Sequence, residues 1–206
     1  MNQAFSYIIL GASIFSHLLP LIIGKRQNNA LLWIYILTGF CFELVLTSFK
    51  RLIQIEGFDY HIIGNIYFIT EFILIAFYYY ARIFKSKVVF TWLLLSLLAL
   101  YAVTFYGNTV VSGKGEGLFI VAFMVFSIIG LYRQLKNVTT KKIEQSQFFW
   151  VNTGFLLYAA GSLPIFITVD TLLQINQDTL YKLWIFRNVL NIIKNIIFAK
   201  ALTLKE

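Results

Sequence analysis

Polar side chains recur inside the last apolar stretch of the chain, Tyr181 to Leu202. At about 100° per residue, its two internal cations and three asparagines fall within roughly one third of a helix circumference. These residues are Arg187, Asn188, Asn191, Lys194 and Asn195. A polar stripe on an otherwise apolar helix could bind an anion or a carbonyl group, hold a carboxylate in an ion pair, or carry a proton.

Two carboxylates lie inside other apolar stretches and could face these cations. Counting about 1.5 Å per residue from the outer ends of the expected helices, Glu43 and Arg187 both lie roughly 9 Å deep. Glu71 and Asn191 both lie roughly 15 Å deep, with Lys194 about one turn deeper. We therefore predict two ion pairs, Glu43 with Arg187 and Glu71 with Lys194.

The composition predicts an integral membrane protein. Of the 206 residues, 59% are hydrophobic and only 13% are charged, and the aromatic residues include 21 Phe. A soluble fold of this size could not cover so much apolar area. The net charge of +8 does not indicate a nucleic-acid partner, because the Lys and Arg residues gather in particular loops.

Seven apolar stretches are each long enough for a hydrocarbon core of about 30 Å, which predicts an all-α, polytopic bundle of seven transmembrane helices in a single domain, residues 1–206. Basic residues concentrate after the first, third and fifth stretches and at the C-terminus, whereas acidic residues occupy the opposite loops. This pattern predicts a multi-pass protein of the cell membrane with its N-terminus outside and its C-terminus inside. The expected spans are residues 4–24, 31–49, 61–84, 88–106, 117–132, 148–168 and 181–202.

Together these helices would enclose a polar interior. The helices over 31–49, 61–84 and 181–202 should be neighbours, with Tyr67 and the asparagines adding hydrogen bonds and the 148–168 helix completing the site. The candidate ligand-binding residues are Glu43, Tyr67, Glu71, Asn152, Arg187, Asn188, Asn191 and Lys194. Two interpretations are open: ion pairs that only fix the helix register, and a site for a ligand, a proton or an ion.

Residue patterns typical of metal sites and of catalysis are missing from the sequence. Cys41 is the only cysteine, which excludes a disulfide and a paired-thiolate metal site within the chain. His17 and His61 have no second ligand one helical turn away, so we expect them to serve in packing and to bind no metal. Since no nucleophile elbow, HExxH or paired-Asp motif occurs, we expect no catalytic residue and a non-catalytic role.

Three segments resemble those of a family of uncharacterised seven-helix bacterial membrane proteins. They are NIYFITEF (residues 65–72), FWVNTGFLLYAAG (149–161) and LWIFRNVLNIIKNIIFA (183–199). Related segments precede histidine-kinase domains in some larger chains, so the resemblance implies a membrane-embedded sensory or ligand-binding module of the bacterial inner membrane. Because this chain stops at Glu206 without a kinase domain, we expect any signalling to need a separate partner protein.

A second resemblance, to retinal-binding rhodopsins, rests on Lys194 in the seventh helix, with Glu71 as the counter-ion of a retinal Schiff base. The third helix lacks the Arg and Trp pattern of microbial rhodopsins, and the sixth lacks their Trp-Tyr-Pro arrangement. Our leading interpretation is therefore a receptor-like bundle without a cofactor that binds a small or lipidic ligand. The alternatives are the retinal photoreceptor, a proton-linked transporter that uses Glu71, and a small membrane enzyme that acts on lipid.

Overall fold

The computed structural model describes residues 3–24, 29–52, 60–83, 90–91, 94–95, 97–99, 102, 113–136, 142–175 and 177–204. All regular secondary structure in these ranges is helical, which confirms the all-α fold class. The helices are α1 (Gln3–Ser16), α2 (Leu18–Ile23), α3 (Ala30–Leu52), α4 (Tyr60–Arg82), α6 (Gly113–Lys136), the 3-10 turn η2 (Ile143–Gln145), α7 (Gln147–Ile175) and α8 (Gln177–Thr203).

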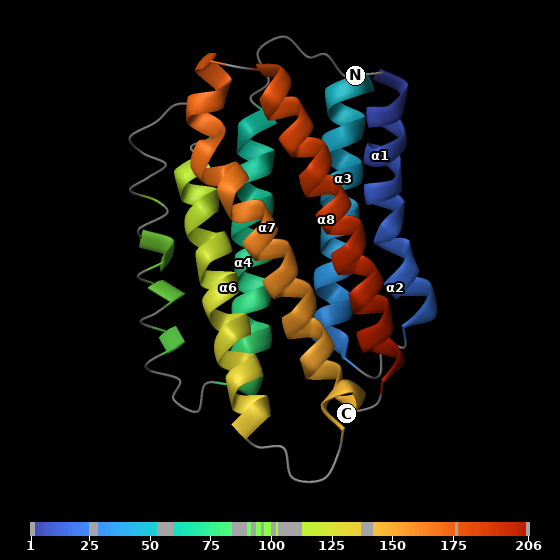
Figure 1. Cartoon of the computed structure of the whole chain (residues 1–206), viewed down its shortest axis with the longest axis vertical. Coiled ribbons are helices and arrows are strands. Elements are labelled where there is room, and N and C mark those ends of the chain that lie inside the picture. Colours follow the sequence, from blue (N-terminus) through green and yellow to red (C-terminus); the bar gives the residue numbers. More distant parts are fainter. Residues whose placement is uncertain are drawn as a thin grey trace.

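The long helices run side by side, with α3 and α7 opposite in direction to α1, α4, α6 and α8, and the two chain termini lie at opposite ends (Figure 1). α3, α6, α7 and α8 each contain one expected apolar stretch and extend beyond it by up to about two turns, because backbone hydrogen bonding continues past the apolar residues, whereas α4 begins one residue before its stretch and ends at Arg82. The expected span over residues 88–106 lies mostly outside the described residues. The described part of that span is helical.

The first expected span is divided into two helices at His17. α1 ends at Ser16 and α2 begins at Leu18, with Pro20 inside α2. A proline has no N–H to donate to the carbonyl four residues earlier, and its ring clashes with that carbonyl. Pro20 therefore disrupts the helix at Ser16, and the His17 N–H bonds instead to the carbonyl of Ile14, 3.2 Å away.

α8 is the central helix of the described bundle. It packs against α7 on one side and against α1 and α2 on the other, while α3 packs against α4 and α6 against α7. Glycines let α7 and α8 approach closely: a Cβ at Gly154 would lie 2.8 Å from Cε1 of Phe198, and one at Gly161 would lie 2.5 Å from Cδ1 of Leu190. α8 therefore reaches α3 and α4 only through long side chains. We expected α3, α4 and α8 to be direct neighbours, but the helices that pack against α8 are α7, α1 and α2.

Aromatic rings fill the space between α4, α6, α7 and α8. Phe72 and Phe119 stack with ring centroids 4.4 Å apart, and Phe155 meets Phe198 edge to face at 4.9 Å. All four rings are at most 2% exposed. This packed aromatic layer fixes the distance between α8 and the other helices and so positions the polar residues of its stripe.

Two helices within the described residues are long and apolar enough to cross a membrane, over Glu116–Lys136 and Gln147–Val169. Shorter apolar helices cover Tyr7–Ile23 and Ala30–Val45. Since a buried core helix of a soluble protein can have the same length and composition, this measure by itself is weak evidence for a membrane location.

Candidate functional site

A buried chain of hydrogen bonds joins Lys194 of α8 to Glu71 of α4 through Tyr35 of α3. The Lys194 Nζ donates to the Tyr35 Oη at 3.1 Å, and the Tyr35 hydroxyl donates to Oε1 of Glu71 at 2.6 Å. All three residues are less than 9% exposed. The amine and the carboxylate thus lie within two hydrogen-bond lengths of each other, but the tyrosine stands between them, so the predicted direct ion pair of Glu71 with Lys194 is not formed.

Aromatic faces surround the Lys194 amine. Its Nζ lies 4.4 Å from the ring centroid of Tyr158, 5.4 Å from that of Tyr35 and 5.9 Å from that of Phe198. Such faces attract a cation by about 2 kcal/mol or more where water is excluded. They complement the carboxylate of Glu71 in holding this amine inside the bundle.

Glu43 of α3 meets Asn191 of α8 and His17, at the junction of α1 and α2. Its Oε1 accepts a hydrogen bond from the Asn191 Nδ2 at 3.1 Å, and its Oε2 lies 3.8 Å from the Nδ1 of His17. The predicted ion pair between Glu43 and Arg187 is therefore wrong. Among the described side chains an ion pair joins Asp178 to Lys182, whereas the contact of Glu43 with His17 is an ion pair only when the histidine is protonated. The two residues were predicted to pair because they lie at the same depth, but the side chain of Arg187 points towards α7.

α1 supplies polar groups that the sequence analysis did not assign to the site. The Asn191 Nδ2 also donates to the Ser13 Oγ at 3.0 Å, and the Asn195 Nδ2 donates to the Ser16 Oγ at 2.7 Å. The Nδ1 of His17 lies 3.2 Å from the carbonyl oxygen of Ser13, which can only accept, so Nδ1 carries the proton of a neutral ring. The spacing of Ser13, Ser16 and His17 on one helical face was a signal that could have revealed this contact.

Tyr67 borders the centre from α4. Its ring is buried against Phe42, with centroids 5.3 Å apart. A Cβ at Gly39 would lie 3.2 Å from the His17 Nε2 and 3.8 Å from the Tyr67 Oη. The absence of a side chain at Gly39 therefore lets the histidine and the phenol approach the same side of α3. The side chain of His61 lies outside the described part of the structure.

Arg187 stacks among aromatic rings of α7 and α8. Its guanidinium carbon lies 5.0 Å from the ring of Trp184, 5.4 Å from that of Phe166 and 6.0 Å from that of Tyr158. Its Nε is buried and has no hydrogen-bond partner among the described residues. The ring of Tyr158 thus contacts both cations of the α8 stripe.

Asn152 lies in a different polar cluster, which is a correction to its expected place. The Tyr79 hydroxyl donates to the Asn152 Oδ1 at 2.8 Å and lies 2.9 Å from the Ser127 Oγ, and the Asn152 Nδ2 donates to the carbonyl of Phe148 at 2.6 Å. Asn152 precedes Tyr158 by six residues, which separates the two by about 120° around α7. This cluster is fully hydrogen-bonded and joins α4, α6 and α7.

The remaining expected residue, Asn188, is half-buried, and its side chain makes no hydrogen bond to a described residue. The centre therefore contains Glu43, Tyr67, Glu71, Arg187, Asn191 and Lys194 of the expected set, joined by Ser13, Ser16, His17, Tyr35 and Tyr158.

Chemically, the centre has two carboxylates and two cations, so its formal charges cancel when His17 is neutral. Oδ1 of Asn195 has no hydrogen-bond partner among the described residues, and two atoms of charged groups at the edge of the centre have none either: Nε of Arg187, a donor, and Oε2 of Glu43, an acceptor. An unmade hydrogen bond of a buried group costs about 1–3 kcal/mol, and more for a charged one. These two atoms can therefore contribute to binding a polar molecule. No cluster of metal-ligating side chains occurs within the part of the chain that the structure describes.

Comparison of the chain with models of protein families, with curated proteins and with solved structures found no match.

Proposed function

We propose that this chain is a seven-span protein of the bacterial inner membrane whose polar centre binds a small or lipidic ligand, in a receptor-like or sensory role. The outer surface of the bundle supports the membrane location. Large apolar side chains face outwards along several helices, with 77% of Ile22, 66% of Ile8, 65% of Leu135 and 64% of Ile167 exposed. Exposed apolar surface of this extent is typical of a protein that contacts lipid.

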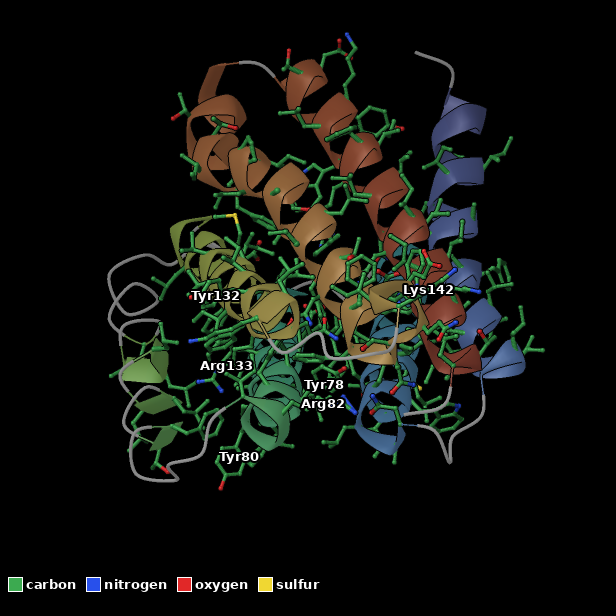
Figure 2. The ribbon with its side chains drawn as sticks, turned by 60° about the horizontal axis from the view of Figure 1, so that its bottom comes forward. Tyr78, Tyr80, Arg82, Tyr132, Arg133 and Lys142 are labelled. Carbon is green, nitrogen blue, oxygen red and sulfur yellow. The ribbon has the colours of Figure 1, made fainter. Side chains whose placement is uncertain are left out.

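The distribution of charge supports an N-outside, C-inside orientation. Figure 2 shows Arg82, Arg133 and Lys142 at the end of the bundle that is lower in Figure 1, opposite to the N-terminus. Tyr80 and Tyr132 lie at the same end. Basic residues favour the cytoplasmic side of a membrane, and tyrosines favour the interface between lipid and water.

One observation carries the proposed ligand site: the buried Nε of the half-buried Arg187 has no hydrogen-bond partner among the described residues, and neither has Oε2 of Glu43. A centre that served only to fix helix register would be expected to satisfy its own polar groups. Its guanidinium is also outside the ion pairs of the described side chains. A ligand with an anionic or carbonyl oxygen would supply both the missing acceptor and a partner for the charge.

The sensory role rests on the resemblance of residues 65–72, 149–161 and 183–199 to membrane segments that precede histidine kinases. These segments include Glu71, Arg187 and Lys194, which form much of the centre. A ligand bound there would contact α8 and α7, and we propose that a separate partner protein detects the resulting change. The proposed partners of the chain are thus the bilayer, the ligand and the separate signalling protein.

Native mass spectrometry of the protein, purified from membranes in a mild detergent, tests the proposal. We expect the wild-type protein to carry a bound small molecule that organic extraction releases. Arg187→Gln should reduce its occupancy about tenfold, equivalent to about 1.4 kcal/mol. Lys182→Gln removes a cation of the same helix that is 56% exposed and serves as the matched control. A wild-type protein without a bound molecule, or equal occupancy in both variants, would contradict the proposal.

A further inference from the structure

Ser162 lies between the two rings of α7 that contact Arg187. Tyr158, Ser162 and Phe166 are spaced four residues apart and therefore share one face of α7. The guanidinium carbon lies 6.0 Å from the ring centroid of Tyr158 and 5.4 Å from that of Phe166. Since these rings are two helical turns apart in sequence, we infer that the guanidinium lies near the turn of α7 that carries Ser162.

The hydroxyl of Ser162 is buried and unpartnered, which is unusual for a helix interior. Its side chain is fully buried, and Oγ has no hydrogen-bond partner among the described residues. Hydroxyls within helices commonly bond to a carbonyl of the preceding turn. Two other hydroxyls of α7 do so: Thr153 donates to the Phe149 carbonyl at 2.9 Å, and Thr168 donates to the Pro164 carbonyl at 2.7 Å. Ser162 is thus available to another group.

The two unpartnered groups can be satisfied by one acceptor. The Nε–H of Arg187 only donates, whereas the hydroxyl of Ser162 can donate or accept, so a group between them that accepts hydrogen bonds would satisfy both. The cation further favours an anionic acceptor. Glu43 and Glu116 lie within electrostatic range of Arg187, and Lys194 balances part of their charge. A singly charged oxyanion would be repelled less by these carboxylates than a doubly charged one.

The surroundings indicate that the rest of the ligand is apolar. Phe166 and Trp184 contact the guanidinium, and their rings meet edge to face at 6.0 Å. Beyond them, Ile167 is 64% exposed and Phe186 is 49% exposed, on the outer surface of the two helices. An apolar chain attached to the anion could therefore continue from this position into lipid.

We propose that Ser162 and Arg187 form a binding subsite for the carboxylate of a long-chain fatty acid, with the hydrocarbon chain directed towards the bilayer. This inference rests on the proposed ligand-binding function and names its ligand class. Ser162 donates a hydrogen bond, which is stronger to a charged carboxylate than to a neutral group of the same shape. Arg187 supplies the opposite charge.

Titrations of the purified protein in detergent with oleate, oleyl alcohol, oleyl phosphate and acetate test the subsite, with tryptophan fluorescence as the readout, because Trp184 contacts the guanidinium. We expect oleate to bind about tenfold or more tightly than oleyl alcohol and acetate. Ser162→Ala should weaken oleate about threefold to tenfold, and Arg187→Gln at least about tenfold, with a smaller effect of each on oleyl alcohol, which lacks the charge. Thr168→Val is the matched control, since its hydroxyl bonds within α7.

Equal affinities for oleate and oleyl alcohol in the wild-type protein would overturn the proposal, whether or not the variants fold. Tighter binding of oleyl phosphate than of oleate would reassign the subsite to a phosphate headgroup, and equal binding of acetate would reassign it to a soluble anion. Should a co-purified ligand persist in Ser162→Ala and resist displacement by oleate, the ligand-binding function would stand and only this subsite would be wrong.

Discussion

Replacing Tyr35 by Phe removes one oxygen atom, the one that joins Lys194 to Glu71. The ring remains, and with it the edge-to-face contacts to Phe155 and Phe198 at 5.4 and 6.0 Å. The change therefore isolates two hydrogen bonds to charged groups, at 2.6 and 3.1 Å. Such bonds contribute about 1.5–3 kcal/mol each in soluble proteins, whereas coupling energies inside a membrane protein average about 0.6 and reach about 1.7. We expect Tyr35→Phe to lower the free energy of unfolding by about 1–3 kcal/mol.

Equilibrium unfolding in mixed micelles with increasing SDS, followed by tryptophan fluorescence and circular dichroism, measures this free energy. Tyr132→Phe is the matched control, because Tyr132 is 64% exposed, and it should change stability by no more than about 0.5 kcal/mol. Equal stabilities of the two variants would refute the reasoning, since the two buried hydrogen bonds would then contribute nothing.

A double-mutant cycle separates the bridging role of Tyr35 from a general effect of its hydroxyl. In a Lys194→Met background the hydroxyl has lost the donor on one side, so Tyr35→Phe should cost less there than in the wild-type protein. We expect a coupling energy of about 0.5–1.7 kcal/mol. Strictly additive effects would show that the tyrosine does not connect the two charges.

Three further predictions concern the contacts around the centre. Glu71→Gln and Lys194→Gln should each destabilise the protein, and the double variant should recover part of the loss because it leaves no uncompensated buried charge; simple additivity in SDS unfolding would contradict this. Tyr79→Phe should cost about 1–3 kcal/mol of stability, because its hydroxyl joins three helices, yet leave the ligand occupancy seen by native mass spectrometry unchanged. Gly154→Leu should destabilise by at least about 1–3 kcal/mol in the same unfolding assay, because even a Cβ would lie 2.8 Å from a ring of α8, whereas Gly11→Leu, with nothing within 4 Å, should not cause this overpacking loss.

Hydropathy and helical periodicity predicted the features that depend on position along one helix. The apolar stretches located the described helices, and the spacing of the α8 stripe predicted that its polar residues share a face. Counting depth brought Glu71 and Lys194 to within two hydrogen bonds of each other. The glycines of α7 proved to be the close-approach positions between α7 and α8, as small residues within membrane helices commonly are.

Features that depend on the direction of a side chain around its helix could not be predicted in the same way. Depth gives the level of Glu43 and of Arg187 but not the neighbour that each one faces, so Glu43 meets His17 and Asn191 instead. The predicted place of Asn152 in the site was wrong for the same reason, since its side chain points to α4 and α6. Knowing which helices are adjacent requires packing information that one amphipathic pattern does not contain.

The polar contacts of α8 divide by depth, and Tyr158 joins the two parts. Lys194, Asn191 and Asn195 donate hydrogen bonds to other helices, whereas the guanidinium of Arg187 contacts aromatic rings. The Tyr158 ring lies 4.4 Å from the amine of Lys194 and 6.0 Å from the guanidinium of Arg187. Tyr158→Leu should therefore lower both the stability, by about 1–2 kcal/mol for the lost cation–π contact, and the affinity for oleate, whereas Tyr35→Phe should lower only the first. SDS unfolding and oleate titration of the two variants measure this difference. A Tyr158→Leu protein that lost stability but bound oleate normally would show that ligand binding is independent of the hydrogen-bonded residues Asn191, Lys194 and Asn195.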